Sequence, residues 1–193
     1  LTQIMVEDNQ LVGAVLNGDM RSFKILIDQN QRLVAHMVGR LVKNEEDREE
    51  LCQDVFIKVH QKLGEFNFKS KLSTWIATIA YRLSINHLQK RRIAIDKDLQ
   101  DLSAKEFKNM IENATPQEAL QEKDTKFFLL AAIELLPVHY KSVVTLFHLE
   151  DMGHAEISEI MDMPVGTVKN YLFRARKLLK DSLELKLEKE ELI

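Results

Sequence analysis

The sequence holds few of the residues that break helices or form tight turns, with six glycines and three prolines among 193 residues. Folds rich in strands need a turn after about every ten residues and therefore use many more of both. Apolar residues instead recur every three or four positions over long stretches, which is typical of helices with one buried face. We therefore expect an all-α fold of long helices joined by few turns.

The helical pattern falls into two parts, separated by a stretch that lacks it. Residues 94–125 contain Pro116 and many acidic side chains, and they show no clear periodicity. A stretch of this kind is typical of a linker. We therefore predict two small helical domains, over residues 1–93 and 126–193, joined by a linker over residues 94–125.

Single residues mark several expected helix ends. Asp19 can cap a helix that continues toward Leu41, because its side chain can accept a hydrogen bond from a free backbone N–H. Gly64 is expected to end the following helix in the usual C-terminal position. Pro137 is expected to break a helix in the second half of the chain.

Composition argues against several classes of protein. No apolar run approaches the roughly 18 residues that span a bilayer, and the first residues lack the pattern of a secretory signal, so we expect no membrane insertion. Cys52 is the single cysteine, which fits a reducing cytoplasm. The six histidines form no ligand motif, so we expect no metal and no cofactor. No phosphate loop or activated nucleophile is found, so we expect no enzyme activity.

The sharpest local pattern is a predicted helix-turn-helix in the C-terminal domain. We expect helices over residues 155–161 and 165–180, separated by a turn at residues 162–164. Five Lys or Arg and no acids occur between Pro164 and Lys180. The second helix buries one face, and its other face carries Lys169, Asn170, Phe173, Arg174 and Lys177. Such a helix suits the major groove of DNA, where early residues contact base edges and later ones neutralise phosphates. The alternative is an ordinary core helix with a solvated basic face.

Two oppositely charged segments distinguish the N-terminal half. Residues 44–54 carry six acids against Arg48 alone, whereas residues 81–92 carry four Lys or Arg and no acid. The acids also suit a solvated helix start, since the helix dipole favours them there. The net charge of −3 hides this separation. A protein of this charge with two basic faces is expected to bind DNA weakly by itself.

Together these segments resemble the extracytoplasmic-function sigma factors of bacterial RNA polymerase. Residues 164–178 resemble the family's recognition helix, and residues 135–137 resemble the start of its C-terminal domain. Residues 47–56 resemble the segment that docks on the polymerase clamp, and residues 74–92 resemble the helix that melts and reads the promoter. The matches follow the family's order and span about residues 11–185.

The sequence departs from the family pattern at four positions. Ser158 stands where the first helix of the helix-turn-helix usually carries alanine, and Asp162 stands where the turn usually carries glycine. Serine is small, and aspartate tolerates a left-handed backbone, so we still expect the motif to form. Phe68 and Lys69 replace the small and acidic residues common in the loop before Trp75, which bears on the base that this loop prefers.

The resemblance implies a sigma factor that directs promoter-specific initiation, at stress or envelope-response promoters and under the control of an anti-sigma factor. The implied partners are core RNA polymerase, promoter DNA as duplex and as melted single strand, and an anti-sigma factor. The chain is expected to act as a monomer in the cytoplasm.

The resemblance also implies three sets of contact residues. Those for the polymerase are Asp47, Glu50, Gln53, Asp54 and Lys58. Those for the start-proximal promoter element and its melting are Asn67, Lys69, Ser70, Thr78, Arg82, Asn86, Lys90, Arg91 and Arg92. Those for the upstream element are Lys169, Asn170, Phe173, Arg174, Arg176 and Lys177. Trp75 is either a core residue or a platform for a base, and Arg176 either binds phosphate or packs its stem on the core.

Two other interpretations remain open. A free-standing transcription regulator would use the helix-turn-helix without the polymerase, but it leaves residues 44–54 and 74–92 unexplained. Such regulators also usually dimerise on paired half-sites. In a purely structural helical adaptor, the basic faces would be accidental.

Overall fold

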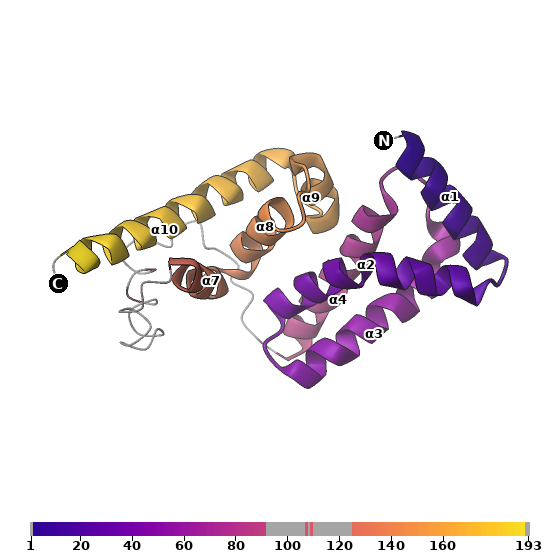
Figure 1. Cartoon of the computed structure of the whole chain (residues 1–193), viewed down its shortest axis with the longest axis horizontal. Coiled ribbons are helices and arrows are strands. Elements are labelled where there is room, and N and C mark those ends of the chain that lie inside the picture. The colour runs from indigo at the N-terminus through magenta and orange to yellow at the C-terminus, as the bar shows by residue number, and fades with distance from the viewer. Residues whose placement is uncertain (1, 92–106, 108, 110–124, 192–193) are drawn as a thin grey trace. The chain divides into compact units, whose positions relative to one another are not determined.

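The structure, a computed structural model, describes residues 2–91, 107, 109 and 125–191. Within these ranges every regular element is a helix, which confirms the all-α prediction (Figure 1). The chain divides into two compact units, Leu1–Ala94 with Thr145–Val165, and Ile95–Val144 with Gly166–Ile193. The predicted linker lies almost entirely outside the described residues, and the domain boundaries stay a prediction.

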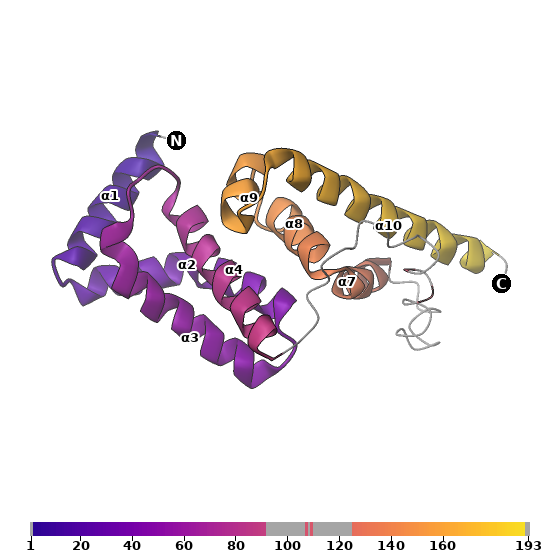
Figure 2. The same ribbon diagram turned by 180° about the vertical axis from the view of Figure 1, so that it is seen from behind.

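The first unit is a bundle in which α2, α3 and α4 pack against one another (Figures 1 and 2). In this unit α1 packs against α2, α9 packs against α4, and the short 3-10 helix η1 follows α3. The elements of this unit are α1 (Thr2–Leu16), α2 (Met20–Leu41), α3 (Glu45–Lys62), η1 (Leu63–Glu65), α4 (Leu72–Lys90) and α9 (His154–Met161). Fully buried side chains from α2, α3 and α4 fill its centre, among them Leu26, Val34, Val38, Val55, Val59, Ile76 and Ala80.

Side-chain caps begin the three central helices. Asp19 accepts a hydrogen bond from the backbone N–H of Arg21 at 3.0 Å, as predicted for the start of α2. The amide oxygen of Asn44 caps α3 in the same way. The start of α4 has no cap from its own N-cap residue. Instead, the backbone N–H of Leu72 donates to the carboxylate of Asp8 in α1, at 3.1 Å.

Two local features differ from the sequence-based expectations. Helix α1 was not among the predicted elements, and it is followed by Gly18 in a left-handed conformation with φ of 89°. Gly64 does not end α3 in the expected way, because that helix ends at Lys62 and Gly64 lies within η1. The chain keeps a right-handed helical path at Leu63, so no left-handed glycine is needed there.

The second unit contains α7, the first part of α8, and nearly all of α10. Their bounds are Thr125–Leu135, Val138–His148 and Val165–Glu191. Pro137 lies between α7 and α8, as expected, and α10 continues well beyond the predicted end at Lys180. Tyr171 of α10 lies with its ring centre 6.1 Å from that of His139 and 5.2 Å from that of Tyr140, both in α8. Among the described residues, no helix is both long and apolar enough to cross a bilayer.

Candidate nucleic-acid interface

Helix α10 separates its apolar and polar residues onto opposite faces, as the sequence predicts. Val168, Leu172 and Ala175 are buried. Of the six residues predicted for the upstream element, Arg174 is half-buried and the other five are exposed: Lys169, Asn170, Phe173, Arg176 and Lys177. Phe173 is 68% exposed, which is unusual for a large aromatic side chain. The face therefore presents cations, an amide and an aromatic ring together, as a base-reading helix needs.

The turn between α9 and α10 shows how the two departures from the family pattern are accommodated. Asp162 adopts the left-handed conformation, with φ of 53° and ψ of 49°, and its backbone N–H bonds the carbonyl of Ser158. The hydroxyl of Ser158 donates in turn to the carbonyl of Met163, at 2.5 Å. The serine thus satisfies a turn carbonyl that an alanine at this position would leave to water.

Glu156 fixes the start of α9. The backbone N–H of Gly153 donates to its carboxylate at 2.9 Å, and the ammonium group of Lys71 lies 2.9 Å away. Partial burial by itself raises the pKa of Glu156, but the hydrogen bonds from Gly153 and Lys71 outweigh it, so the pKa lies below the ordinary value. The carboxylate of Glu156 is therefore ionised near neutral pH when α9 is folded.

The loop before α4 is supported by a cluster of aromatic rings. The ring of Phe66 lies 4.7 Å from that of Phe68 and 5.4 Å from that of Trp75, between ring centres. Trp75 is half-buried in this cluster. Phe68 has φ of 57°, a strained conformation for a bulky residue. The sequence marks Phe68 as a departure from the family pattern but gives no sign of its left-handed backbone conformation. Strain of this kind clusters at functional sites.

The polar side of this loop and of α4 holds the residues predicted for the start-proximal element. Those that are exposed are Asn67, Lys69, Arg82, Asn86, Lys90 and Arg91, and those half-buried are Ser70 and Thr78. The side chain of Asn67 accepts from the backbone N–H of Lys69, which shapes the loop. Arg92 lies outside the described residues.

Two acids, Glu159 of α9 and Asp162 just after this helix, face the same polar side within the first unit. The hydroxyl of Ser70 donates to Glu159 at 2.7 Å, and Arg82 lies 3.9 Å from the carboxylate of Asp162. Thr78 is engaged differently, since its hydroxyl donates to the backbone carbonyl of Thr74 at 2.9 Å. Ser70 and Arg82 therefore have acidic partners in this structure, which a nucleic acid would have to replace.

The predicted polymerase contacts divide into two groups. Glu50, Gln53 and Asp54 are exposed on α3, and Lys58 is half-buried. Asp47 differs, because its side chain turns toward α4 and binds Arg91, as the 2.7 Å between their charged atoms shows. The structure therefore gathers four of the five on an accessible part of α3.

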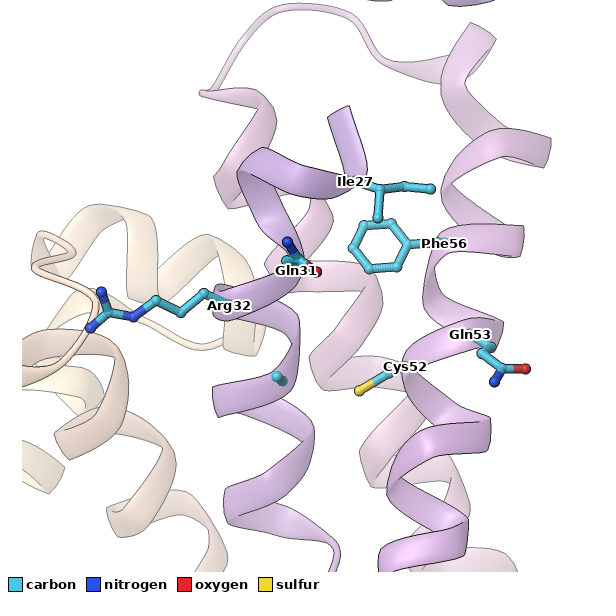
Figure 3. Close-up of a pocket in the computed structure, with 7 residues that line it drawn as sticks. Ile27, Gln31, Arg32, Cys52, Gln53 and Phe56 are labelled. Carbon is cyan, nitrogen blue, oxygen red and sulfur yellow. The ribbon is translucent and has the colours of Figure 1, made fainter. Parts of the chain in front are cut away.

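A shallow apolar groove runs between α2 and α3 beside these residues (Figure 3). Ile27 of α2 lies next to the ring of Phe56 of α3, and the sulfur of Cys52 points toward α2. Burial raises the pKa of the Cys52 thiol, and the nearby charge of Arg48 lowers it only in part. Cys52 is therefore a weakly nucleophilic thiol in an apolar wall. Among the described residues, no group of three or more His, Cys, Asp or Glu is placed to hold a metal ion.

Comparison with known proteins identifies both halves of the chain. Residues 26–93 match the family described as Sigma-70 region 2, and residues 129–179 match the family described as Sigma-70, region 4. The RNA polymerase sigma-H factor of Pseudomonas aeruginosa is 30% identical over 182 residues, which cover 92% of this chain and 94% of that protein. The ECF RNA polymerase sigma-E factor of Escherichia coli K12 is 31% identical over 182 residues, with the same coverage.

Two solved structures share the fold at lower sequence identity. CnrH, in complex with the cytosolic domain of CnrY, is 18% identical, with a TM-score of 0.60 over 92% of this chain and 97% of that one. The sigma factor RpoE of Bartonella quintana, in complex with the anti-sigma factor NepR, is 17% identical, with a TM-score of 0.63 over 85% of this chain and 98% of that one.

Proposed function

Because this chain belongs to the extracytoplasmic-function sigma factors, we propose that it binds core RNA polymerase and directs it to a specific class of promoters. The observation that carries the proposal is similarity at about 30% identity along nearly the whole of two such sigma factors. The exposed basic face of α10 and the exposed acidic segment of α3 are the surfaces that such a function needs.

Docking on the polymerase is assigned to the accessible part of α3. Glu50 and Asp54 supply negative charge, and Gln53 supplies hydrogen-bonding groups between them. Lys58 lies one turn further along the helix. Charged residues at the rim of an interface steer association, and the apolar groove beside them offers area for burial. These residues therefore supply both orientation and contact area.

Recognition and melting of the start-proximal element are assigned to the loop before α4 and the polar side of α4. Exposing a base costs a few kcal/mol of stacking, which polar and aromatic contacts to the flipped base offset. Asn67, Lys69 and Ser70 border this loop, and the half-buried Trp75 lies at its base. Arg82, Asn86 and Lys90 follow along α4, where amide and cationic groups can bind the melted strand.

Recognition of the upstream element is assigned to α10. Asn170 is suited to adenine and Arg174 to guanine, while Phe173 can contact a thymine methyl group. Lys169 adds a further base-edge contact. Arg176 and Lys177, further along the helix, are placed for phosphates, which position the protein without reading sequence.

We infer how the chain is regulated from the expectation that each DNA-binding surface is weak by itself. Two modest sites on one chain gain affinity when the polymerase holds both, because the second contact becomes intramolecular. A partner that covers either surface therefore prevents initiation. The Bartonella quintana sigma factor of similar fold is seen with an anti-sigma factor, and we extend such control to this chain, along with stress or envelope-response promoters. The chain acts as a monomer in the cytoplasm and has no catalytic activity of its own.

The test is run-off transcription by bacterial core RNA polymerase, with and without the purified chain, from a library of promoter fragments. We expect selective initiation that depends on the chain and is lost in Arg174→Ala and in Asn86→Ala. Arg21→Ala is the matched control, since Arg21 is an exposed cation on α2 outside all three surfaces. Its activity should equal that of the unsubstituted chain.

Two results would overturn the proposal. A chain that fails to bind core polymerase, yet binds duplex DNA specifically, would be a free-standing regulator. Initiation that survives both Arg174→Ala and Asn86→Ala would place promoter recognition on other residues.

A further inference from the structure

The carboxylate of Asp47 links the start of α3 to the end of α4. It lies 2.7 Å from Nη2 of Arg91 and 3.6 Å from Nε2 of His87. Asp47 itself is only 9% exposed, although the other acids of the first turn, Glu45 and Glu46, are exposed to solvent. A carboxylate largely removed from water needs charged or hydrogen-bonding partners, and Asp47 has His87 in the last turn of α4 and Arg91 just after this helix.

The side chain of Asp47 is not required to cap its own helix. Asn44 already performs that role, since its amide oxygen accepts from the backbone N–H of Asp47 at 2.9 Å. The carboxylate can therefore reach the end of α4, where it lies beside His87 and Arg91. This contact joins the start of the helix assigned to polymerase docking to the end of the helix assigned to promoter DNA.

Arg91 differs from Asp47 in its access to solvent. Its side chain remains 54% exposed, so the guanidinium group can bind Asp47 and still face a ligand. Its backbone N–H bonds the carbonyl of His87, which fixes the main chain where α4 ends. An arginine has five donors in a planar fork, and one carboxylate uses only part of them. A single ion pair thus orients the side chain and leaves donors for a phosphate.

We propose that Asp47 is a positioning residue for promoter recognition, which holds Arg91 at the end of α4 for contact with the DNA backbone. This inference rests on the proposed function, and it deepens it by moving Asp47 from the polymerase interface to the promoter interface. Without Asp47, Arg91 keeps its charge but loses its orientation. Binding to any DNA would then persist through charge alone, while the ordered contact at the promoter would weaken.

The experiment uses holoenzyme assembled from core polymerase and the full chain. Three affinities are measured for Asp47→Asn, namely for core polymerase, for promoter DNA and for DNA of unrelated sequence. We expect an unchanged affinity for core, an equal or higher affinity for unrelated DNA, and a loss of about fivefold at the promoter, because one long side chain must be ordered anew. Asp28→Asn removes an exposed carboxylate from α2, outside all three sets of contact residues, and should change none of the three affinities.

A double-mutant cycle tests whether Asp47 acts through Arg91. In the Arg91→Ala background, Asp47→Asn should cause no further loss at the promoter. Asp47→Glu, which keeps the charge, should restore part of the affinity. If Asp47→Asn fails to fold, the promoter loss is measured instead in Arg91→Gln, whose side chain is exposed enough to be replaced without unfolding the domain.

The experiment separates a failure of the proposed function from a failure of this inference. If the unsubstituted chain does not bind core or direct initiation, the proposed function fails. If the unsubstituted chain is active and Asp47→Asn weakens core binding instead, Asp47 is a polymerase contact and the inference is wrong. An unchanged promoter affinity, or a loss that persists in the Arg91→Ala background, also overturns it.

Discussion

Adjacent residues on α10 should respond in opposite ways to the same truncation. Leu172 is 2% exposed, whereas Phe173, the next residue, is 68% exposed. Leu172→Ala removes buried methyl groups and leaves a cavity, which costs about 2–5 kcal/mol of unfolding free energy. Phe173→Ala removes a larger side chain from solvent, where substitutions usually change stability by less than about 0.5 kcal/mol.

In promoter binding the order should be reversed, with Phe173→Ala causing the larger loss. One apolar contact to a thymine methyl group contributes on the order of 1 kcal/mol, so Phe173→Ala should weaken the promoter complex of the holoenzyme about fivefold. Its fold should be unchanged. Urea denaturation followed by circular dichroism measures the first effect, and titration of promoter fragments with holoenzyme measures the second.

Two results would refute this reasoning. If Phe173→Ala destabilises the chain as much as Leu172→Ala does, the face of α10 that is buried has been misassigned. If Phe173→Ala is stable and binds the promoter at full affinity, Phe173 makes no contact with DNA. The second result would leave the fold intact and remove one residue from the upstream interface.

Three further predictions concern single side chains. Ser158→Ala should lower the unfolding free energy by about 1 kcal/mol, because the Met163 carbonyl loses its hydrogen-bond donor. Adding Asp162→Gly should recover part of this loss, because glycine adopts the left-handed conformation without strain. Thermal denaturation of the single and double variants checks both effects. Glu156→Gln should cost about 0.5 kcal/mol near neutral pH. Because the pKa of Glu156 is lowered in the folded state, the loss of unfolding free energy in Glu156→Gln should be largest at pH values above the ordinary pKa of 4.5. It should disappear as the pH falls through the pKa of the folded state, and urea titrations across this pH range measure it. Cys52 should react with iodoacetamide more slowly than glutathione at about pH 8, as followed by mass spectrometry, because its raised pKa leaves less thiolate.

The features that could be predicted from sequence are those decided by residues close together in the chain. Asp19 caps α2 through Arg21, two residues away, and the spacing of Leu172 and Ala175 predicts the buried face of α10. Helix α1 was harder to predict, because Gly13 lies within it and weakens the helical pattern.

The features that could not be predicted depend on contacts between distant segments. The family resemblance implies that Asp47 contacts the polymerase, and only the packing of α3 on α4 shows its pairing with Arg91. Phe68 likewise packs in a cluster of aromatic rings with Phe66 and Trp75. Its left-handed backbone conformation is not expected for an aromatic residue. The residues assigned to DNA and polymerase remain predictions until the experiments above are made.

The cap that Asp8 provides for α4 has a consequence for the order in which the chain folds. The two residues that form it, Asp8 and Leu72, are 64 positions apart, so this hydrogen bond cannot form from neighbours in sequence. Closing so long a loop carries an entropic cost that must be met before the contact forms. We therefore expect the first turn of the helix assigned to promoter melting to be stabilised late in folding, once α1 lies beside the start of α4.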